Sequence, residues 1–396
     1  MTATPHRPMP ELGALPDLAE AHVRTHLTPP RARHLALPAA HAESLALLSE
    51  LFTQARPQLP TGYMNQPRFR AAYLLYFLPT CAATVLHVLA ESQVLTGLVA
   101  RPLRVLDLGA GPLTASLALA LATDVQLEVT AVDAARQAME DGQAILRQLR
   151  PDATVRLLAG NLRDGALLGK LTGPYDLILA ANVLNEWPHQ TSRPATDWLL
   201  RLLTAKLAPG GAVVLVEPAT RHASHRLIAV REHMLAATEL AVLAPCKGVM
   251  PCPLADSTRD WCHAEQPWQR PRQVALLDEA VGHRRATLKF SHLVLADRQR
   301  PAWPRDGFRV IGGAMVAGET FRRYLCGADG RRVAVAERHD ARRKWPELLD
   351  AWRGDALQVP GHPGEFKAWR GTEPTWQPPE ASPRAAPPLA PRRPRR

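Results

Sequence analysis

The sequence contains no apolar run as long as the ~20 residues that a membrane-spanning helix needs. The segment from Met1 to Pro30 has scattered Pro, His and Arg where a signal peptide would have a continuous apolar stretch. Cysteine is scarce, with 5 residues in 396, which argues against a disulfide framework and favours a metal site or reactive thiols. These absences predict a soluble, cytoplasmic protein without a membrane partner.

Acidic residues are also in deficit. Lys and Arg number 48 against 37 Asp and Glu, which gives a formal charge of +11. Part of this excess lies in the Arg-rich segment 390–396. A basic balance favours nucleic-acid partners, because Lys and Arg neutralise phosphates. The alternative interpretation is a basic tail without a specific partner.

Composition and apolar spacing divide the chain into five parts. Residues 1–38 are rich in Pro, His and Arg and predict a flexible arm, whereas 39–100 have helical apolar spacing. From 101 to 243, short apolar runs alternate with helical stretches, which predicts βαβ units and a parallel sheet. Residues 244–370 hold a Cys- and Pro-rich insertion and further strands, and the Pro- and Arg-rich residues 371–396 predict disorder. The predicted core strands are 103–108, 127–132, 154–158, 175–181 and 212–216, with a later strand at 287–295.

A glycine-rich turn follows the first predicted strand. Asp107 ends the run of apolar residues, and Gly109 and Gly111 lie where a helix should begin. Side chains at these glycines would collide with a closely approaching ligand, and the N-terminus of the helix offers oriented N–H groups. Ligands of such sheets lie outside the carboxyl ends of the strands. The turn therefore predicts a nucleotide-like cofactor site whose contacts include Asp107, Gly109 and Gly111.

Two further strand ends support this site. Asp133 ends the second strand, about twenty residues after the turn, at the spacing of a carboxylate that binds ribose hydroxyls. Asn161 follows the third strand, where it could lie at the edge of an adenine ring. Together with the Pro-Gly-Gly turn at 209–211, this set resembles the class I methyltransferases. The resemblance implies S-adenosylmethionine as cofactor, whereas a dehydrogenase-like or purely structural Rossmann domain is the alternative.

The loop after the fourth strand would face the transferred methyl group in this architecture. It reads Asn182-Val183-Leu184-Asn185-Glu186-Trp187. The two prolines that amide-nitrogen methyltransferases tend to have here are missing, and so is the Cys nucleophile of cytosine-C5 enzymes. Asn182, Asn185 and Glu186 could bind substrate or the methionine part of the cofactor, or could cap the next helix. We include Asn182 among the expected cofactor contacts and name no catalytic residue.

Four of the five cysteines lie in the C-terminal half. Cys246, Cys252 and Cys262 fall within seventeen positions among Pro and Gly turns, and Cys326 follows later. Four thiolates suit tetrahedral zinc or an iron–sulfur cluster. Buried thiols without a metal are the alternative, and His263 could replace one thiol. Cys81, on a helical apolar segment, is expected in the core.

The series Ala-Pro-Cys, Cys-Pro-Leu and Trp-Cys-His, after the Glu217-Pro218 strand end, resembles the methyltransferase-like small-ribosomal-subunit proteins of the Rsm22 family. The resemblance extends from Ala71-Ala72-Tyr73 to Trp352-Arg353-Gly354-Asp355. It implies a class I methyltransferase fold with an N-terminal helical region and a Cys-rich metal-binding insertion. It also implies a four-cysteine 4Fe-4S or zinc site and a role in assembly of the small ribosomal subunit. The implied metal ligands are Cys246, Cys252, Cys262 and Cys326.

Three functions follow from these features. The first is an S-adenosylmethionine-binding protein that contacts or methylates ribosomal RNA. The second is a non-catalytic assembly factor that uses the same fold and iron–sulfur site as an RNA-binding scaffold. The third is a small-molecule or protein methyltransferase, which the basic charge and the cysteines disfavour.

Overall fold

The chain folds into two compact units, one of residues 7–303 and one that contains residues 304–396. We treat each unit by itself. The computed structural model describes residues 9–60, 62–96, 98, 102–164, 166–186, 193–246, 251–283, 285–298, 307–327, 330–344 and 346–358.

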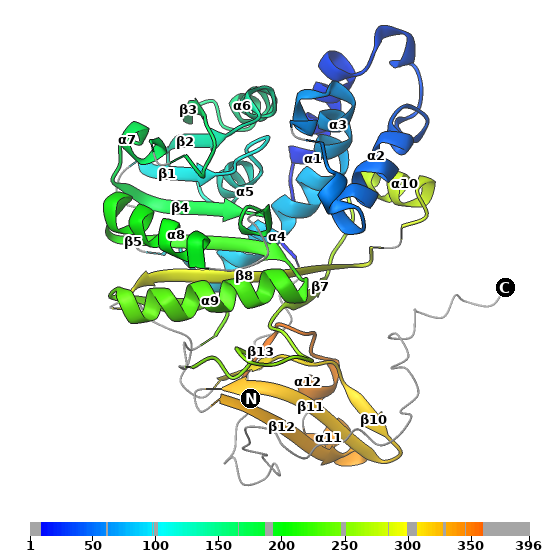
Figure 1. Ribbon diagram of the computed structural model, residues 1–396. Coiled ribbons are helices and arrows are strands. Elements are labelled where there is room, and N and C mark those ends of the chain that lie inside the picture. The colour runs from blue at the N-terminus through cyan, green and yellow to red at the C-terminus, as the bar shows by residue number, and fades with distance from the viewer. Residues whose placement is uncertain are drawn as a thin grey trace, which may run out of the picture. The chain divides into compact units, whose positions relative to one another are not determined.

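The larger unit is built on a mixed sheet with the strand order β3-β2-β1-β4-β5-β8-β6, and β7 pairs with β8 (Figure 1). Strands β1 to β5 are parallel, whereas β8 is antiparallel to β5, β6 and β7. The order reverses between β1 and β4, which is where α/β sheets of this kind bind ligands. The strands are β1 (Leu103–Leu108), β2 (Leu127–Asp133), β3 (Thr154–Ala159), β4 (Tyr175–Ala181), β5 (Leu207–Pro218), β6 (Leu240–Ala244), β7 (Ala264–Pro267) and β8 (Thr287–Asp297).

Helices cover both faces of this sheet, because alternate strand residues point to opposite sides. On β4, Leu177 and Leu179 belong to one apolar core and Ile178 and Ala180 to the other. The resulting three-layer arrangement confirms the predicted Rossmann-like methyltransferase fold. The first core contains α4 (Leu78–Ser92), α5 (Thr114–Ala122) and α6 (Arg136–Leu149), and the second contains α7 (Leu167–Lys170), α8 (Arg193–Lys206) and α9 (Arg221–Ala237).

An N-terminal helical region packs beside the sheet (Figure 1). The sequence predicts a flexible arm up to residue 38, yet α1 lies within it and buries Leu15 and Ala19 completely. Asp141 of α6 fixes this region, because it pairs with His22 at 2.9 Å and with Arg70 at 2.6 Å. The elements are α1 (Leu15–His22), η1 (Val23–Leu27), η2 (Pro30–Ala32), α2 (Leu37–Thr53), η3 (Arg56–Gln58), η4 (Tyr63–Asn65), α3 (Pro67–Ala72) and η5 (Tyr73–Phe77), and η5 leads into α4.

The continuous helix formed by α3, η5 and α4, Pro67–Ser92, is long and apolar enough to cross a membrane by length and composition. However, 83% of its most apolar window is buried inside the protein, as in the core helix of a water-soluble domain. Its central turn, η5, is π-helical. Tyr76 of η5 donates a 2.5 Å hydrogen bond to Asp278 of α10 (Arg272–Ala280), which ties the helix to the later part of the chain.

The described residues of the smaller unit form a five-stranded antiparallel sheet with two short helices. Its core contains Phe321, Leu325 and Ala334 from the strands, packed with Ala341 and Leu348 from the helices. The elements are β9 (Gly307–Val310), β10 (Met315–Ala317), β11 (Thr320–Gly327), β12 (Gly330–Glu337), α11 (Arg338–Lys344), α12 (Pro346–Asp350) and β13 (Ala356–Gln358).

Candidate functional site

The glycine turn lies between β1 and α5, at the carboxyl edge of the sheet. Gly109 and Gly111 have left-handed φ values of 60° and 49°. A Cβ on Gly109 would lie 2.5 Å from Cγ2 of Val183, so this glycine is required by packing within the protein. A Cβ on Gly111 would meet nothing within 4 Å. Space for a closely approaching ligand is therefore present at Gly111.

Asp133 lies directly beside this space. One carboxylate oxygen accepts the Gly111 N–H at 2.9 Å, and the other accepts the Ala135 N–H at 2.7 Å. Each carboxylate oxygen can accept a second hydrogen bond. The fold thus brings together the predicted pair, Gly111 and Asp133. Open space next to a carboxylate fits the ribose of a nucleoside cofactor.

Asp107 lies below the turn. It is only 1% exposed, and one of its oxygens accepts both the N–H (3.1 Å) and the hydroxyl (2.6 Å) of Ser116 in α5. Burial raises the pKa of this carboxyl to about 7, although the two hydrogen bonds from Ser116 favour its charged form. Asp107 therefore connects β1 to α5 and supports the turn from inside.

Asn161 lies in the loop after β3 and is exposed. Its side-chain oxygen accepts the Arg163 N–H at 2.9 Å, which shapes a tight turn. Arg163 in turn donates to the backbone carbonyl of Glu186 at 2.7 Å. The loops after β3 and β4 are therefore in contact at the edge where Asn161 was expected to meet the adenine.

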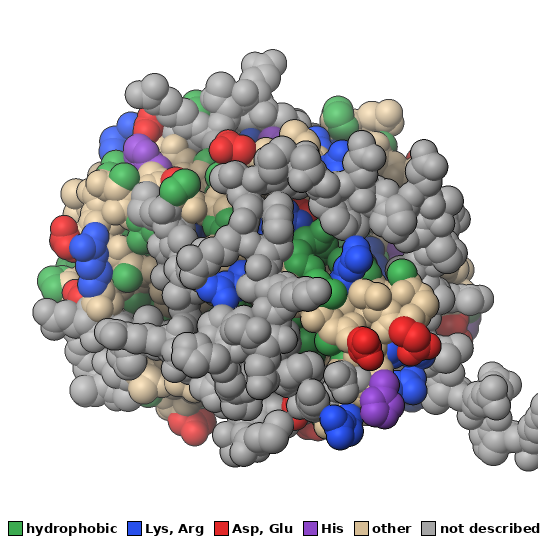
Figure 2. Space-filling model, turned by 90° about the horizontal axis from the view of Figure 1, so that it is seen from below, with side chains coloured by type: hydrophobic (Ala, Val, Ile, Leu, Met, Phe, Trp, Pro, Cys, Tyr) green, Lys and Arg blue, Asp and Glu red, His purple; other side chains and the backbone are tan. Residues whose placement is uncertain are grey.

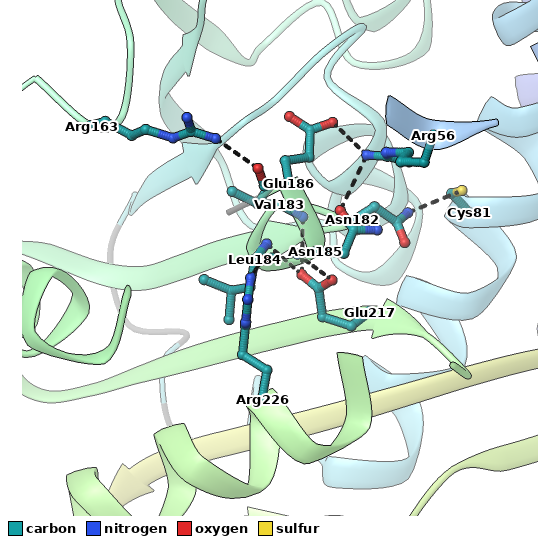
Figure 3. Close-up of polar contacts among 10 residues, drawn as sticks. All are labelled: Arg56, Cys81, Arg163, Asn182, Val183, Leu184, Asn185, Glu186, Glu217 and Arg226. Carbon is teal, nitrogen blue, oxygen red and sulfur yellow. Dashed lines mark hydrogen bonds and ion pairs between the residues drawn. The ribbon is translucent and has the colours of Figure 1, made fainter. Parts of the chain in front are cut away.

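The loop after β4 has an unusual backbone, shown in Figure 3. Asn182 has a φ of 60°, a left-handed conformation that is uncommon for residues other than glycine and that Asn adopts more readily than most. Its amide donates to the Cys81 sulfur at 3.3 Å, and its backbone N–H bonds to the Val216 carbonyl at 2.7 Å. Cys81 thus has a specific polar partner at this edge, although the sequence predicts it as an ordinary core residue.

The N-terminal region supplies residues to this edge that the sequence did not single out. Arg56 of η3 donates to the Glu186 carboxylate at 3.0 Å and to the Asn185 side-chain oxygen at 3.4 Å (Figure 3). Tyr63 and Tyr73 pack against Ala135, next to Asp133. The Arg56 contacts span 129 and 130 residues of sequence, and the tyrosines also lie far from Ala135 in the sequence, so no local motif could have indicated them.

Three of the predicted metal ligands lie near one another. The pKa of Cys252 is raised to about 12, mainly by burial. The nearby thiols of Cys262 and Cys246 contribute to this rise, whereas Arg231 of α9 opposes it. Even so, no group of three or more His, Cys, Asp or Glu among the described residues could hold a metal ion. The predicted metal-binding insertion is therefore not shown.

His263, the alternative metal ligand, and Cys326, the fourth expected ligand, have other surroundings. His263 has both ring nitrogens engaged, at 3.2 Å from the Trp261 carbonyl and 3.1 Å from the Glu265 carboxylate. Neither ring nitrogen is therefore available for a metal, which argues against the alternative that His263 replaces one of the thiols as a ligand. Cys326 lies on β11 of the smaller unit, opposite Arg331 of β12.

A cavity of about 340 Å³ lies at the opposite, amino edge of the sheet. Its lining includes Arg104, Glu128, Arg156 and Thr172. Ligands of parallel α/β sheets bind at the carboxyl edge, where the glycine turn, Asp133 and the loop after β4 converge. We therefore place the candidate cofactor site at the carboxyl edge.

The sheet order and this edge define a class I methyltransferase-like protein. The family model described as "Mitochondrial small ribosomal subunit Rsm22" matches residues 68–355, which is most of the chain. The chain belongs to this family. No curated protein matches it in sequence.

Solved structures with a similar fold include a methyltransferase from Pyrococcus furiosus, which is 16% identical, with a TM-score of 0.32 over 52% of this chain and 81% of that one. The plantazolicin methyltransferase BpumL in complex with SAH is 9% identical, with a TM-score of 0.35 over 66% of this chain and 98% of that one. The fibrillarin/Nop5p complex matches at 17% identity and a TM-score of 0.29, over 51% and 78%. Likeness this distant says nothing about a substrate.

Proposed function

We propose that the chain binds S-adenosylmethionine at the carboxyl edge of its sheet. The observation that carries this proposal is the open space at Gly111 beside the Asp133 carboxylate. Gly111 and Asp133 would hold the ribose part of the cofactor, with Gly109, Asn161 and Asn182 on the surrounding loops. The bound cofactor would supply an activated methyl group. Calorimetry with S-adenosylmethionine tests the proposal, and wild-type protein that does not bind would refute it.

We propose further that the protein acts in assembly or translation of the small ribosomal subunit, where it contacts or methylates ribosomal RNA. The family description and the net charge of +11 support this partner. Methyl transfer would proceed by direct attack on the activated methyl, so the site would contribute positioning more than acid–base chemistry. The family description refers to mitochondria, whereas the sequence predicts a cytoplasmic location. Fractionation of cells that carry the tagged protein would decide between the two compartments.

The RNA partner is not evident from surface charge alone. On the face drawn in Figure 2, the described Lys and Arg side chains are interspersed with Asp and Glu, without a continuous basic patch among them. The Arg-rich segment 390–396 lies outside the described residues. Crosslinking the protein to RNA in cells tests the contact. Quantifying modified nucleosides of the small subunit in a deletion strain then tests methylation.

A non-catalytic assembly factor is the second candidate, and the loop after β4 favours it. Asn182 is engaged by Cys81, and Asn185 and Glu186 are both engaged by Arg56, so these polar side chains already have partners within the protein. Unchanged nucleoside modification in the deletion strain, together with RNA crosslinks, would establish this candidate. A small-molecule or protein methyltransferase would instead give no RNA crosslinks.

The metal site remains part of the proposal. Cys246, Cys252 and Cys262 of the larger unit would be ligands of a 4Fe-4S cluster, or of zinc as the alternative, and the fourth ligand expected from the sequence, Cys326, belongs to the smaller unit. The proximity of the first three thiols supports it, because a metal ion that binds there would take neighbouring thiols as ligands and release their protons. Metal analysis and the visible spectrum of anaerobically purified protein distinguish the outcomes. Brown protein means iron and sulfur, colourless protein with zinc means a zinc site, and folded metal-free protein refutes both.

A further inference from the structure

The loop after β4 contains η6 (Leu184–Glu186), a single 3-10 turn whose first N–H groups need acceptors. The first N–H groups of any helical turn have no partner within the turn. A nearby Ser, Thr, Asn or Asp side chain usually accepts from them. Here the acceptor comes from another strand, more than thirty residues later in the sequence.

That acceptor is Glu217, near the end of β5. Its carboxylate accepts the N–H groups of Val183 at 3.0 Å and Leu184 at 2.8 Å through one oxygen, and of Asn185 at 3.0 Å through the other (Figure 3). Arg226 of α9 donates to the Leu184 carbonyl. Both charged side chains are only 1% exposed. The turn is thus held by two buried ionisable side chains.

The turn matters because of what is attached to it. Asn182, which precedes it, has the left-handed backbone and the contact with Cys81. Val183 packs directly on the glycine turn at Gly109. Any movement of η6 would therefore shift both Asn182 and the support of the cofactor turn.

We propose that Glu217 is a positioning residue of the methyl-transfer edge, which fixes η6 so that Asn182 and the glycine turn keep their places around the cofactor. This inference rests on the proposed function, because it assigns a task within the same site. Glu217 does not itself line the space at Gly111. It acts through the three backbone N–H groups that it accepts.

The test uses Glu217→Gln in the full-length protein, because the amide keeps the size of the side chain but turns one acceptor oxygen into a donor. Asp176→Asn is the matched control. Asp176 lies on β4 itself, is 4% exposed and accepts the Arg104 backbone N–H at 3.0 Å, but at the amino end of the strand. We expect hydrogen–deuterium exchange to accelerate in residues 182–186 for Glu217→Gln and not for the control.

S-adenosylmethionine affinity is the second measurement, and we expect it to fall about tenfold in Glu217→Gln and to stay unchanged in Asp176→Asn. The pH profile adds a signature that a merely structural role would not give. Burial raises the pKa of Glu217 to about 7, with Glu186 adding to the rise and the three backbone N–H groups opposing it. Arg226 is the positive charge that faces it. Wild-type affinity should therefore weaken between pH 8 and pH 6, by up to about tenfold.

In Glu217→Gln this pH-dependent step should be absent, whereas any step from Asp107 or from the ligand itself remains in both proteins and cancels in the comparison. Faster exchange without a change in affinity or in the pH profile would overturn the inference and leave the proposed function intact. Equal losses of affinity in the variant and the control would also overturn it. Failure of the wild-type protein to bind S-adenosylmethionine at any pH would refute the proposed function first.

Discussion

Gly109 and Gly111 are two residues apart, yet the structure predicts different effects of an added methyl group. At Gly109 it should mainly lower stability, and at Gly111 it should mainly prevent cofactor binding. Both have positive φ, so Ala at either position should cost ~1–2 kcal/mol of backbone strain. At Gly109 the new Cβ would also lie 2.5 Å from Val183, and such overpacking typically costs a further ~1–3 kcal/mol. Gly109→Ala should therefore lower the free energy of unfolding by ~2–5 kcal/mol in total. Gly111→Ala should lose only the strain, because its Cβ points into open space.

Cofactor binding should follow the reverse order. Gly111→Ala fills the space beside Asp133, so we expect it to remain folded and to lose S-adenosylmethionine binding. Denaturant unfolding and calorimetry on the same samples measure both effects. Val183→Ala provides the internal check, because it removes the methyl groups that the new Cβ would strike. Combined with Gly109→Ala, it should recover ~1–3 kcal/mol relative to the sum of the single changes. Equal stability of the two glycine variants, or wild-type binding by Gly111→Ala, would refute the reasoning.

Three further predictions concern charged and thiol groups. Asp133→Ala should weaken S-adenosylmethionine binding by ~1–3 kcal/mol in calorimetry, because ribose hydroxyls lose their acceptor, and wild-type affinity would argue against this cofactor position. Burial raises the pKa of Asp107 from 3.8 to about 7. The folded protein therefore holds a proton there that the unfolded chain releases, so stability from this group is full below pH ~4 and is lost as pH rises to about 7. Asp107→Asn should flatten that part of the unfolding curve measured against pH, and an unchanged slope would contradict the burial argument. Finally, anaerobically purified protein should be brown, and Cys81→Ser should leave the colour, while single Ser replacements at Cys246, Cys252 and Cys262 should bleach it.

The core of the fold could be predicted because its signals are local. The predicted run 175–181 coincides with β4, and 103–108 coincides with β1, since a buried parallel strand is a short apolar run between turns. Strand β6 was missed, because Leu240–Ala244 follows α9 after two residues and reads as a continuation of the helix. The Pro, His and Arg content of this segment predicts a flexible arm, but α1 also packs against the distant elements α6 and η5, which composition does not reveal.

The candidate site was predictable only in part. The sequence spacing placed Gly111 and Asp133 together, and the structure shows their hydrogen bond. It could not separate Gly111 from Gly109, because the neighbour that fills the space at Gly109 comes from the loop after β4. Arg56 belonged to no motif, and Glu217 was noted only as part of the Glu217-Pro218 strand end, without a role. Both residues act through contacts with the loop after β4, which is far from each of them in the sequence, so only the folded chain reveals their roles.

The position of β8 has a consequence for synthesis on the ribosome. Strand β8 lies between β5 and β6, yet it follows β5 in the sequence by roughly 70 residues. At about 5–20 residues per second, the growing chain exposes an unpaired apolar β5 edge for several seconds before its neighbour emerges. Exposed edges of this kind are templates for misassociation. Nascent chains paused before Thr287 should therefore bind chaperones and aggregate, whereas chains extended beyond Asp297 should resist both.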